Sequence, residues 1–204
     1  MLKQIFTELA KKYSGDLVLI NRLWEELEAL YSDRNRHYHS LSHLENLYIR
    51  LSEIKEQISD WDTMLFSLFY HDSIYHAKKS DNEEQSAVLA EKRMRELQVP
   101  FEKIEACKAQ ILATKTHVKA ADSDTNFFTD ADLSILGADW ETYLTYAKNV
   151  RKEYAIYPDL IYKPGRKKVL QHFLHMDRIF KTDYFYEKGE SRAKENLRKE
   201  MESY

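Results

Sequence analysis

Glycine and proline are scarce in this chain, and their scarcity favours long uninterrupted helices. Only four glycines and three prolines occur among the 204 residues. Both residue types interrupt helices and are used heavily in the turns of β-rich proteins, so this composition argues against a sheet-based fold. Apolar residues recur at three- and four-residue spacing, for example over residues 16–31, which is typical of a helix with one buried face. The sequence therefore predicts an all-α fold.

Capping signals divide the chain into successive helices. The residues that we expect to begin or end helices are Ser42 with Glu45, Asp60 or Asp62, Ser80 with Glu83, Gly137, Asp139 and Gly165-Arg166. Residues 118–127 are expected to form a polar loop, and a short helix is expected over residues 130–136. The helix after Gly165 is expected to reach about Phe180, with a charged amphipathic tail from Glu190.

The length of the chain and the absence of any linker predict one compact multi-helix domain. We expect it to span residues 1–204, with residues 1–15 and 188–204 as peripheral helical extensions. An amphipathic tail of this kind can pack on its own core or on a partner, so the oligomeric state is left open.

Composition excludes several classes of function. The 31 basic and 34 acidic residues leave a net charge of −3, which argues against extended binding to duplex nucleic acid. No apolar run approaches the roughly 18 residues of a membrane span, and the first residues do not resemble a signal peptide. Cys107 is the only cysteine, so no intrachain disulfide can form, and we interpret it as a small apolar filler. A cytoplasmic location is expected.

The pair His71-Asp72 is the feature most indicative of chemistry, because it closes the apolar run over residues 64–70. A buried imidazole beside a buried carboxylate is costly unless something compensates the charge. Together with His43 and Asp132, this pair offers two neutral nitrogens and two anionic oxygens. Such a set neutralises a divalent cation and leaves coordination positions open. The sequence thus predicts a metal site formed by His43, His71, Asp72 and Asp132.

Each of these residues also has a simpler interpretation. His43 could be a hydrogen-bonded histidine near a helix start, and His71-Asp72 could be a hydrogen-bonding pair at a helix end. Asp130 and Asp132 could both cap the helix expected at residue 133. Taken together, these interpretations would leave an unexplained polar group on each of three helices.

The order of these residues resembles the H…HD…D signature of the HD-domain metal-dependent phosphohydrolases, and of their bacterial branch in particular. The similarity extends over roughly residues 24–200. The phrases that carry it are residues 36–43, 71–75, 81–87, 130–137 and 151–154. The resemblance implies a helical HD-domain bundle that hydrolyses a small phosphate ester, such as a nucleotide, as a phosphomonoesterase or phosphodiesterase. Water activated by a bound metal ion would be the nucleophile.

A single divalent ion is expected as the cofactor, and the donor set suits Mn, Fe, Co, Ni, Zn or Mg. Because the two aspartates cancel the charge of the ion, an arriving phosphate also needs basic partners. The candidates for substrate binding are Arg36, Lys115, His117 and Arg166. Arg166 follows a glycine and is expected to open a helix, where an anion binds favourably. Each base could also be a solvated surface charge, and His117 could bind a second metal instead.

Asp72 is a candidate for catalysis as well as for metal binding, and two further residues are candidates for catalysis. The phrase Tyr38-His39-Ser40-Leu41-Ser42-His43 is similar to one in the cyclic-nucleotide phosphodiesterases, whose first histidine protonates the leaving group. His39 is therefore a candidate general acid. Glu83 could orient the attacking water or act as a base outside the metal ligands. Its part in a helix cap would explain Glu83 equally well.

Two rival functions remain open at this stage. A non-catalytic HD module would sense a nucleotide or phosphate without hydrolysing it. A di-iron HD oxygenase needs two additional histidines between residues 72 and 132, where only His76 and His117 occur. His76 follows Asp72 more closely than that pattern normally allows, which favours one metal.

Overall fold

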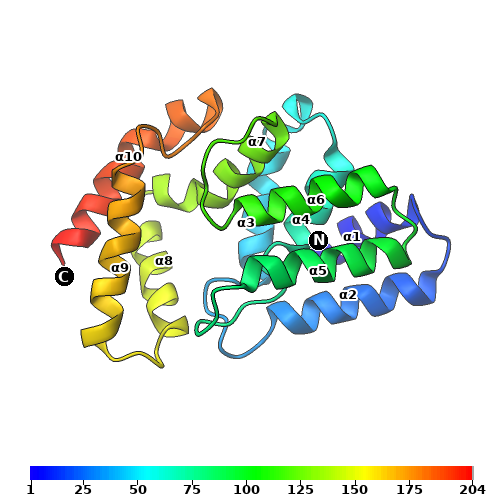
Figure 1. The fold of residues 1–204 in the computed structure, drawn as a ribbon, viewed down its shortest axis with the longest axis horizontal. Coiled ribbons are helices and arrows are strands. Elements are labelled where there is room, and N and C mark those ends of the chain that lie inside the picture. The colour runs from blue at the N-terminus through cyan, green and yellow to red at the C-terminus, as the bar shows by residue number, and fades with distance from the viewer. Residues whose placement is uncertain (204) are drawn as a thin grey trace. The chain divides into compact units, whose positions relative to one another are not determined.

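The computed structural model describes residues 1–203 and contains helices but no strand within them. The all-α prediction is confirmed. The α-helices are α1 (Leu2–Lys11), α2 (Leu17–Tyr31), α3 (Leu41–Ser52), α4 (Trp61–Tyr70), α5 (Asn82–Glu96), α6 (Phe101–Ala113), α7 (Ser123–Asp132), α8 (Trp140–Glu153), α9 (Asp159–Leu174) and α10 (Asp183–Glu202). Two short 3-10 helices, η1 (Lys55–Gln57) and η2 (Leu133–Gly137), complete the order (Figure 1).

The chain packs into two compact units, and the boundary between them falls within α7. The first unit ends at Thr129 and the second begins at Asp130. The expectation of a single domain stays a prediction. Each unit is described by itself below.

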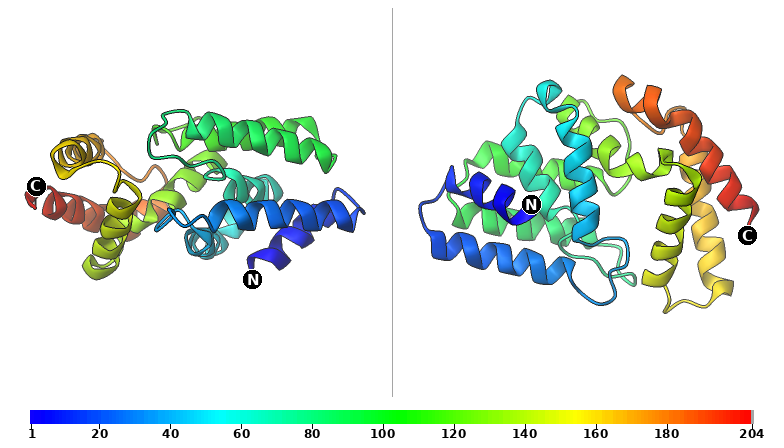
Figure 2. Two further views of the ribbon diagram at one scale, coloured as in Figure 1. Left: turned by 90° about the horizontal axis from the view of Figure 1, so that it is seen from below. Right: turned by 180° about the vertical axis from the view of Figure 1, so that it is seen from behind.

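Helix α4 is the central helix of the first unit. All its residues from Thr63 to Tyr70 are buried, and α1, α3, α5 and α6 all contact it. Helices α5 and α6 lie side by side along their lengths, as the views of Figures 1 and 2 both show. The apolar run over residues 64–70 thus forms the centre of a helical core, and residues 71 and 72 follow directly from it.

Aromatic side chains join the first helices to this core. The Phe6 ring of α1 meets the Phe69 ring edge-on, with centroids 5.2 Å apart, and Trp24 of α2 lies 6.1 Å from Phe6. Such edge-to-face pairs add to the stabilisation that comes from burial. Helix α1 therefore contributes directly to the core of the first unit.

Two carboxylates, one of them buried, fix the start of α4. Asp60 accepts the backbone N–H of Thr63 at 3.1 Å, as predicted for one of the two candidate caps. The second candidate, Asp62, is instead bonded by Lys12 and Tyr13. Asp124 of α7 accepts the backbone N–H groups of Ser59 and Asp60 at 3.0 and 2.8 Å. The start of α4 is thereby tied to α7 through hydrogen bonds that no local sequence pattern indicates.

The two predicted capping boxes are wrong. Helix α3 begins after Ser40, two residues before the predicted Ser42, and α5 begins after Asp81 rather than Ser80. Neither N-cap side chain accepts a backbone N–H of its helix. The Asp139 cap of α8 is confirmed, because its carboxylate accepts the N–H of Thr142 at 3.0 Å.

The expected polar loop over residues 118–127 is wrong in its second half, because α7 begins at Ser123. Three of the polar residues that suggested a loop, Asp124, Thr125 and Asn126, are buried and bonded. Asn126 donates to the carbonyls of Ala120 and Asp122 at 2.9 Å each, and Phe128 is fully buried. Hydrogen bonding inside the protein lets these polar residues occupy a buried helix.

Helices α8, α9 and α10 of the second unit enclose an ion pair. Arg166 donates from Nε and Nη2 to the Glu200 carboxylate at 2.8 and 2.9 Å, and the Tyr143 hydroxyl donates to the same carboxylate. Since α9 already begins at Asp159 and contains Pro164, the expectation that Gly165-Arg166 precedes a helix is wrong. The helix also ends at Leu174, before the expected Phe180.

The glycine at 137 permits a close approach rather than a left-handed turn. A Cβ at Gly137 would lie 2.9 Å from the Cα of Gly189, and η2 and α10 pack against each other there. None of the four glycines, all of them within the described residues, has a positive φ. The prediction that Gly137 is a C-cap in the left-handed conformation is therefore wrong. Helix α10 begins at Asp183, earlier than the predicted tail.

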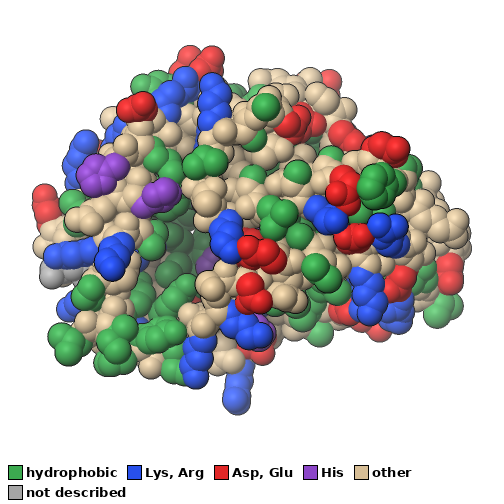
Figure 3. Space-filling view, viewed as in Figure 1, with side chains coloured by type: hydrophobic (Ala, Val, Ile, Leu, Met, Phe, Trp, Pro, Cys, Tyr) green, Lys and Arg blue, Asp and Glu red, His purple; other side chains and the backbone are tan. Residues whose placement is uncertain are grey.

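Two features of the chain bear on its reactivity and surroundings. Cys107 of α6 is fully buried, and burial raises the pKa of its thiol to about 12. None of the helices within residues 1–203 combines the length and the apolar character needed to cross a membrane. On the face shown in Figure 3, acidic and basic side chains are interspersed.

Candidate metal centre

His71 projects its imidazole from the end of the central helix α4. Its backbone N–H still bonds to the carbonyl of Ser67 at 2.9 Å, so the helix holds the residue in place. The ring Nδ1 lies 3.0 Å from the carbonyl oxygen of Leu68, and the ring edge meets Phe128 at a centroid distance of 5.6 Å. Because a carbonyl only accepts, Nδ1 carries the proton, and Nε2 of the neutral ring presents a lone pair.

His43 brings a second imidazole to the same point. It lies in the first turn of α3 and is buried. Its Nε2 is 3.1 Å from Nε2 of His71. Two nitrogens bound about 2.1 Å from one ion at a right angle would lie roughly 3.0 Å apart, so this spacing fits adjacent ligands of a metal.

Asp72 adds a carboxylate beside the two imidazoles. Its Oδ2 lies 3.1 Å from His71 Nε2 and 3.8 Å from His43 Nε2. Burial by itself raises the pKa of the Asp72 carboxyl, but the charges that His71 and His39 carry in their protonated forms, and the hydrogen bond that protonated His71 then donates, outweigh it and hold the pKa well below its ordinary value. A positive charge beside this carboxylate, whether a protonated imidazole or a metal ion, thus favours its ionised form.

Asp132 completes the group of residues that could hold a metal ion. It is the last residue of α7, a continuous helix that starts at Ser123 in the first unit. One ligand atom from each of His43, His71 and Asp132 lies within 4.8 Å of the other two. These three residues form a possible metal site. Asp72 does not belong to this set of three, and its role as a fourth ligand stays a prediction.

Arg36 holds the backbone that carries Asp72. Its Nη1 donates to the carbonyls of Asp72 and His39 at 2.6 and 3.1 Å, and its Nη2 donates to the carbonyl of Ser73 at 2.9 Å. The guanidinium also lies 4.8 Å from the centroid of the Tyr31 ring. Arg36 thus links the turn after α4 to the segment before α3, and its predicted contact with substrate stays a prediction.

The catalytic candidates His39 and Glu83 lie close enough to Asp72 for their charges to interact with it. The His39 ring stacks on Tyr75 with centroids 4.1 Å apart, and its charge is among those that lower the pKa of Asp72. Glu83 is half-buried in the first turn of α5. Burial raises the pKa of its carboxyl, and the charge of Asp72 raises it further while Lys115 opposes the change.

The other predicted cations have acceptors within the protein. The ammonium of Lys115 donates to the carbonyl of Ser80 at 2.8 Å and pairs with Glu84. Arg166 is buried in its pair with Glu200, in the interior of α9 rather than at its start. The helix-start argument for anion binding at Arg166 is therefore wrong. His117 lies half-buried after α6 with a φ of 53°.

Sequence reasoning missed the function of Asp130, which it treated as a candidate cap for a helix at residue 133. The carboxylate is fully buried and accepts the backbone N–H groups of Lys181 and Thr182 at 2.9 and 2.7 Å. Asp130 thus holds the backbone that leads into α10. The sequence shows two aspartates one residue apart, at positions 130 and 132. Nothing in that spacing shows that one bonds the backbone before α10 and the other faces the imidazoles.

Comparison with known proteins identifies no relative. No protein-family model, no curated protein and no solved structure matches this chain. The resemblance to the HD-domain proteins therefore rests on the residues of the chain alone.

Proposed function

We propose that this protein is a metal-dependent phosphohydrolase that cleaves a small phosphate ester, such as a nucleotide. The proposal depends chiefly on one observation: the Nε2 atoms of His43 and His71 face each other 3.1 Å apart, and Oδ2 of Asp72 lies 3.1 Å from that of His71. The order of these residues in the chain, which resembles the HD-domain signature, supports it.

The tautomer of His71 favours a cation at this point. Since its Nδ1 donates to Leu68, its Nε2 offers a lone pair toward His43 whenever the ring is neutral. A divalent ion would satisfy nitrogens from both rings at once, and the carboxylates of Asp72 and Asp132 would balance its charge. Ions that accept mixed nitrogen and oxygen ligands, such as Mn, Fe, Co, Ni, Zn or Mg, suit this set.

A divalent ion in this site would supply Lewis acidity, which polarises a phosphoryl oxygen and activates water. The residues of the chain would do the rest. His39 is the candidate to protonate the leaving oxygen, because an imidazole transfers protons near neutral pH. Glu83, whose carboxyl pKa is raised by burial, is the candidate to orient the attacking water or accept its proton.

The test is a matrix of metals and substrates. The purified protein is loaded with each candidate ion, its metal content is measured by elemental analysis, and phosphate release is scored for a panel of nucleotides and sugar phosphates. We expect one divalent ion per chain and release from at least one nucleotide. His43→Ala should lose both ion and activity, whereas His76→Ala, which changes an exposed histidine of the same unit, should keep both.

The outcomes separate the rival functions. A full complement of ion in His43→Ala contradicts the ligand assignment. Tight nucleotide binding without phosphate release under any metal indicates a sensing module. Two irons per chain with consumption of O₂ indicate an oxygenase.

A further inference from the structure

The second unit contains a buried ammonium group that lacks a hydrogen-bond acceptor among residues 1–203. The Lys181 side chain is only 3% exposed, and its Nζ makes no hydrogen bond. Its near neighbour is Asp130 Oδ1 at 3.4 Å, which is longer than the 2.7–2.9 Å typical of charge-assisted bonds. That oxygen already accepts the backbone N–H of Lys181 at 2.9 Å.

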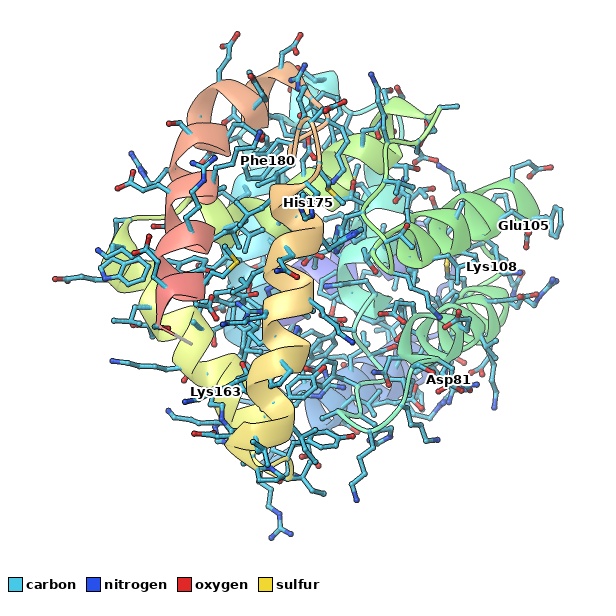
Figure 4. The ribbon with its side chains drawn as sticks, turned by 60° about the vertical axis from the view of Figure 1, so that its left-hand side comes forward. Asp81, Glu105, Lys108, Lys163, His175 and Phe180 are labelled. Carbon is cyan, nitrogen blue, oxygen red and sulfur yellow. The ribbon has the colours of Figure 1, made fainter. Side chains whose placement is uncertain are left out.

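The backbone around Lys181 is held in place by two buried carboxylates. Glu190 accepts the N–H groups of Ile179 and Phe180 at 3.0 and 3.1 Å, and Asp130 accepts those of Lys181 and Thr182. Phe180, labelled in Figure 4, marks this segment between α9 and α10. Four consecutive N–H groups are thus bonded to side chains, so the segment is fixed before any ligand arrives.

An ammonium with unused donors is costly to bury, because desolvation is not repaid by hydrogen bonds. Burial lowers the pKa of Lys181, and the charges of Asp130 and Asp132 oppose that change. Lys181 is therefore close enough to the candidate metal ligand Asp132 for the charge of that carboxylate to affect its pKa. The predicted cations Arg36, Lys115 and Arg166 differ from Lys181, because each of them donates to protein acceptors.

We propose that Lys181 binds a phosphoryl oxygen of the substrate whose phosphate is held by the ion at Asp132. The inference rests on the proposed function and names the positive group that the phosphate needs. The bound oxygen would accept from the unused donors of Nζ, and the fixed segment 179–182 would keep the ammonium in place while the ester is cleaved.

The experiment measures binding of inorganic phosphate to manganese-loaded protein by calorimetry, with manganese content determined in parallel. Lys181→Met should retain one ion per chain and bind phosphate roughly 10- to 100-fold more weakly, as expected for loss of a hydrogen bond to a charged group. The phosphate affinity of Lys181→Arg should lie between those of the wild type and Lys181→Met. Lys163→Gln is the control, because Lys163 is an exposed lysine of the same unit that lies 3.8 Å from Asp159 and should leave phosphate affinity unchanged.

A second variant distinguishes a loss of phosphate binding from a loss of stability. If Lys181→Met loses stability because Asp130 is left unpaired, the double variant Asp130→Asn/Lys181→Met removes both charges. We expect it to regain stability and still bind phosphate weakly. Wild-type phosphate affinity in either variant, with the ion retained, overturns the inference and makes Lys181 a counter-ion only. A wild-type protein that takes up no metal overturns the proposed function and this inference with it.

Discussion

At the scale of single residues, Asp72 occupies the most demanding position. It directly follows a buried helix, yet its side chain stays 19% exposed and its pKa is held well below the ordinary value despite burial. Its carboxylate faces two imidazole nitrogens at 3.1 and 3.8 Å. A carboxylate at that place favours a cation between the rings.

Asp72→Asn should therefore weaken metal binding while preserving the shape of the side chain. Removing a charged ligand, or a charged group bonded to a ligand histidine, lowers metal affinity by roughly tenfold or more. The measurement is a titration with manganese followed by calorimetry. Asp81→Asn is the control, since Asp81 is another acid of the first unit and bonds only Gln85 through its side chain among the described contacts. Equal affinities in the two variants would remove Asp72 from the site.

The sequence indicated the candidate ligands because their residue types are unusual where they stand. A histidine and an aspartate after a run of seven apolar or small residues have few reasons to be there. The roles of Arg36 and Lys181 could not be predicted in this way. Arg36 bonds to backbone carbonyls, which leave no trace in residue identity, and the environment of Lys181 depends on Asp130, 51 positions away.

At the scale of elements, the turn after α4 depends on one guanidinium. Arg36 donates to the carbonyls of residues 39, 72 and 73, so a single side chain joins this turn to the segment before α3. Methionine in its place would leave those carbonyls without their donor.

Arg36→Met should lower the free energy of unfolding by about 1–3 kcal/mol, because half-buried carbonyls lose hydrogen bonds to a charged donor. It should also weaken metal binding, although Arg36 bonds no candidate ligand atom. Urea unfolding and a manganese titration check the two effects. Arg34→Met, at an exposed position nearby, should leave both unchanged. A loss of stability with normal metal affinity would show that the site does not depend on this turn.

Helices with an apolar stripe could be predicted, whereas helices buried through polar side chains could not. The stripe of α2 and the apolar run of α4 follow the rule that burial selects apolar residues. In α7, Asn126 and Asp124 are buried because their hydrogen bonds reach residues 59, 60, 120 and 122. Capping was predicted correctly at Asp60 and Asp139 and wrongly at Ser42 and Ser80. The two errors arose because several neighbouring polar residues could each act as the N-cap.

At the scale of the whole molecule, Asp60 makes stability depend on pH. Burial raises the pKa of its carboxyl, but hydrogen bonds from Lys103 and Thr63 outweigh burial, so the pKa is lower in the folded protein than in the unfolded chain. A lowered carboxyl pKa stabilises the fold above the unfolded value of about 3.9, and this contribution is lost as pH falls through the folded value.

Urea unfolding should therefore show stability declining as pH falls below about 4. Asp60→Asn should reduce stability at pH 7 by about 1 kcal/mol or less, because the pair with Lys103 is partly exposed and screened by solvent. The same variant should decline less steeply in acid than the wild type. Lys103→Met removes the partner and should reproduce both changes. A parallel decline in all three proteins would show that other carboxyl groups govern acid unfolding.

The single thiol of Cys107 can report when the helices around it separate. The group lies on α6, which packs against the central helix α4, and a pKa of about 12 leaves almost no thiolate at neutral pH. An aromatic disulfide reagent would modify the native protein only when these two helices separate. Since the chain holds no other cysteine, the labelling rate would follow that one event.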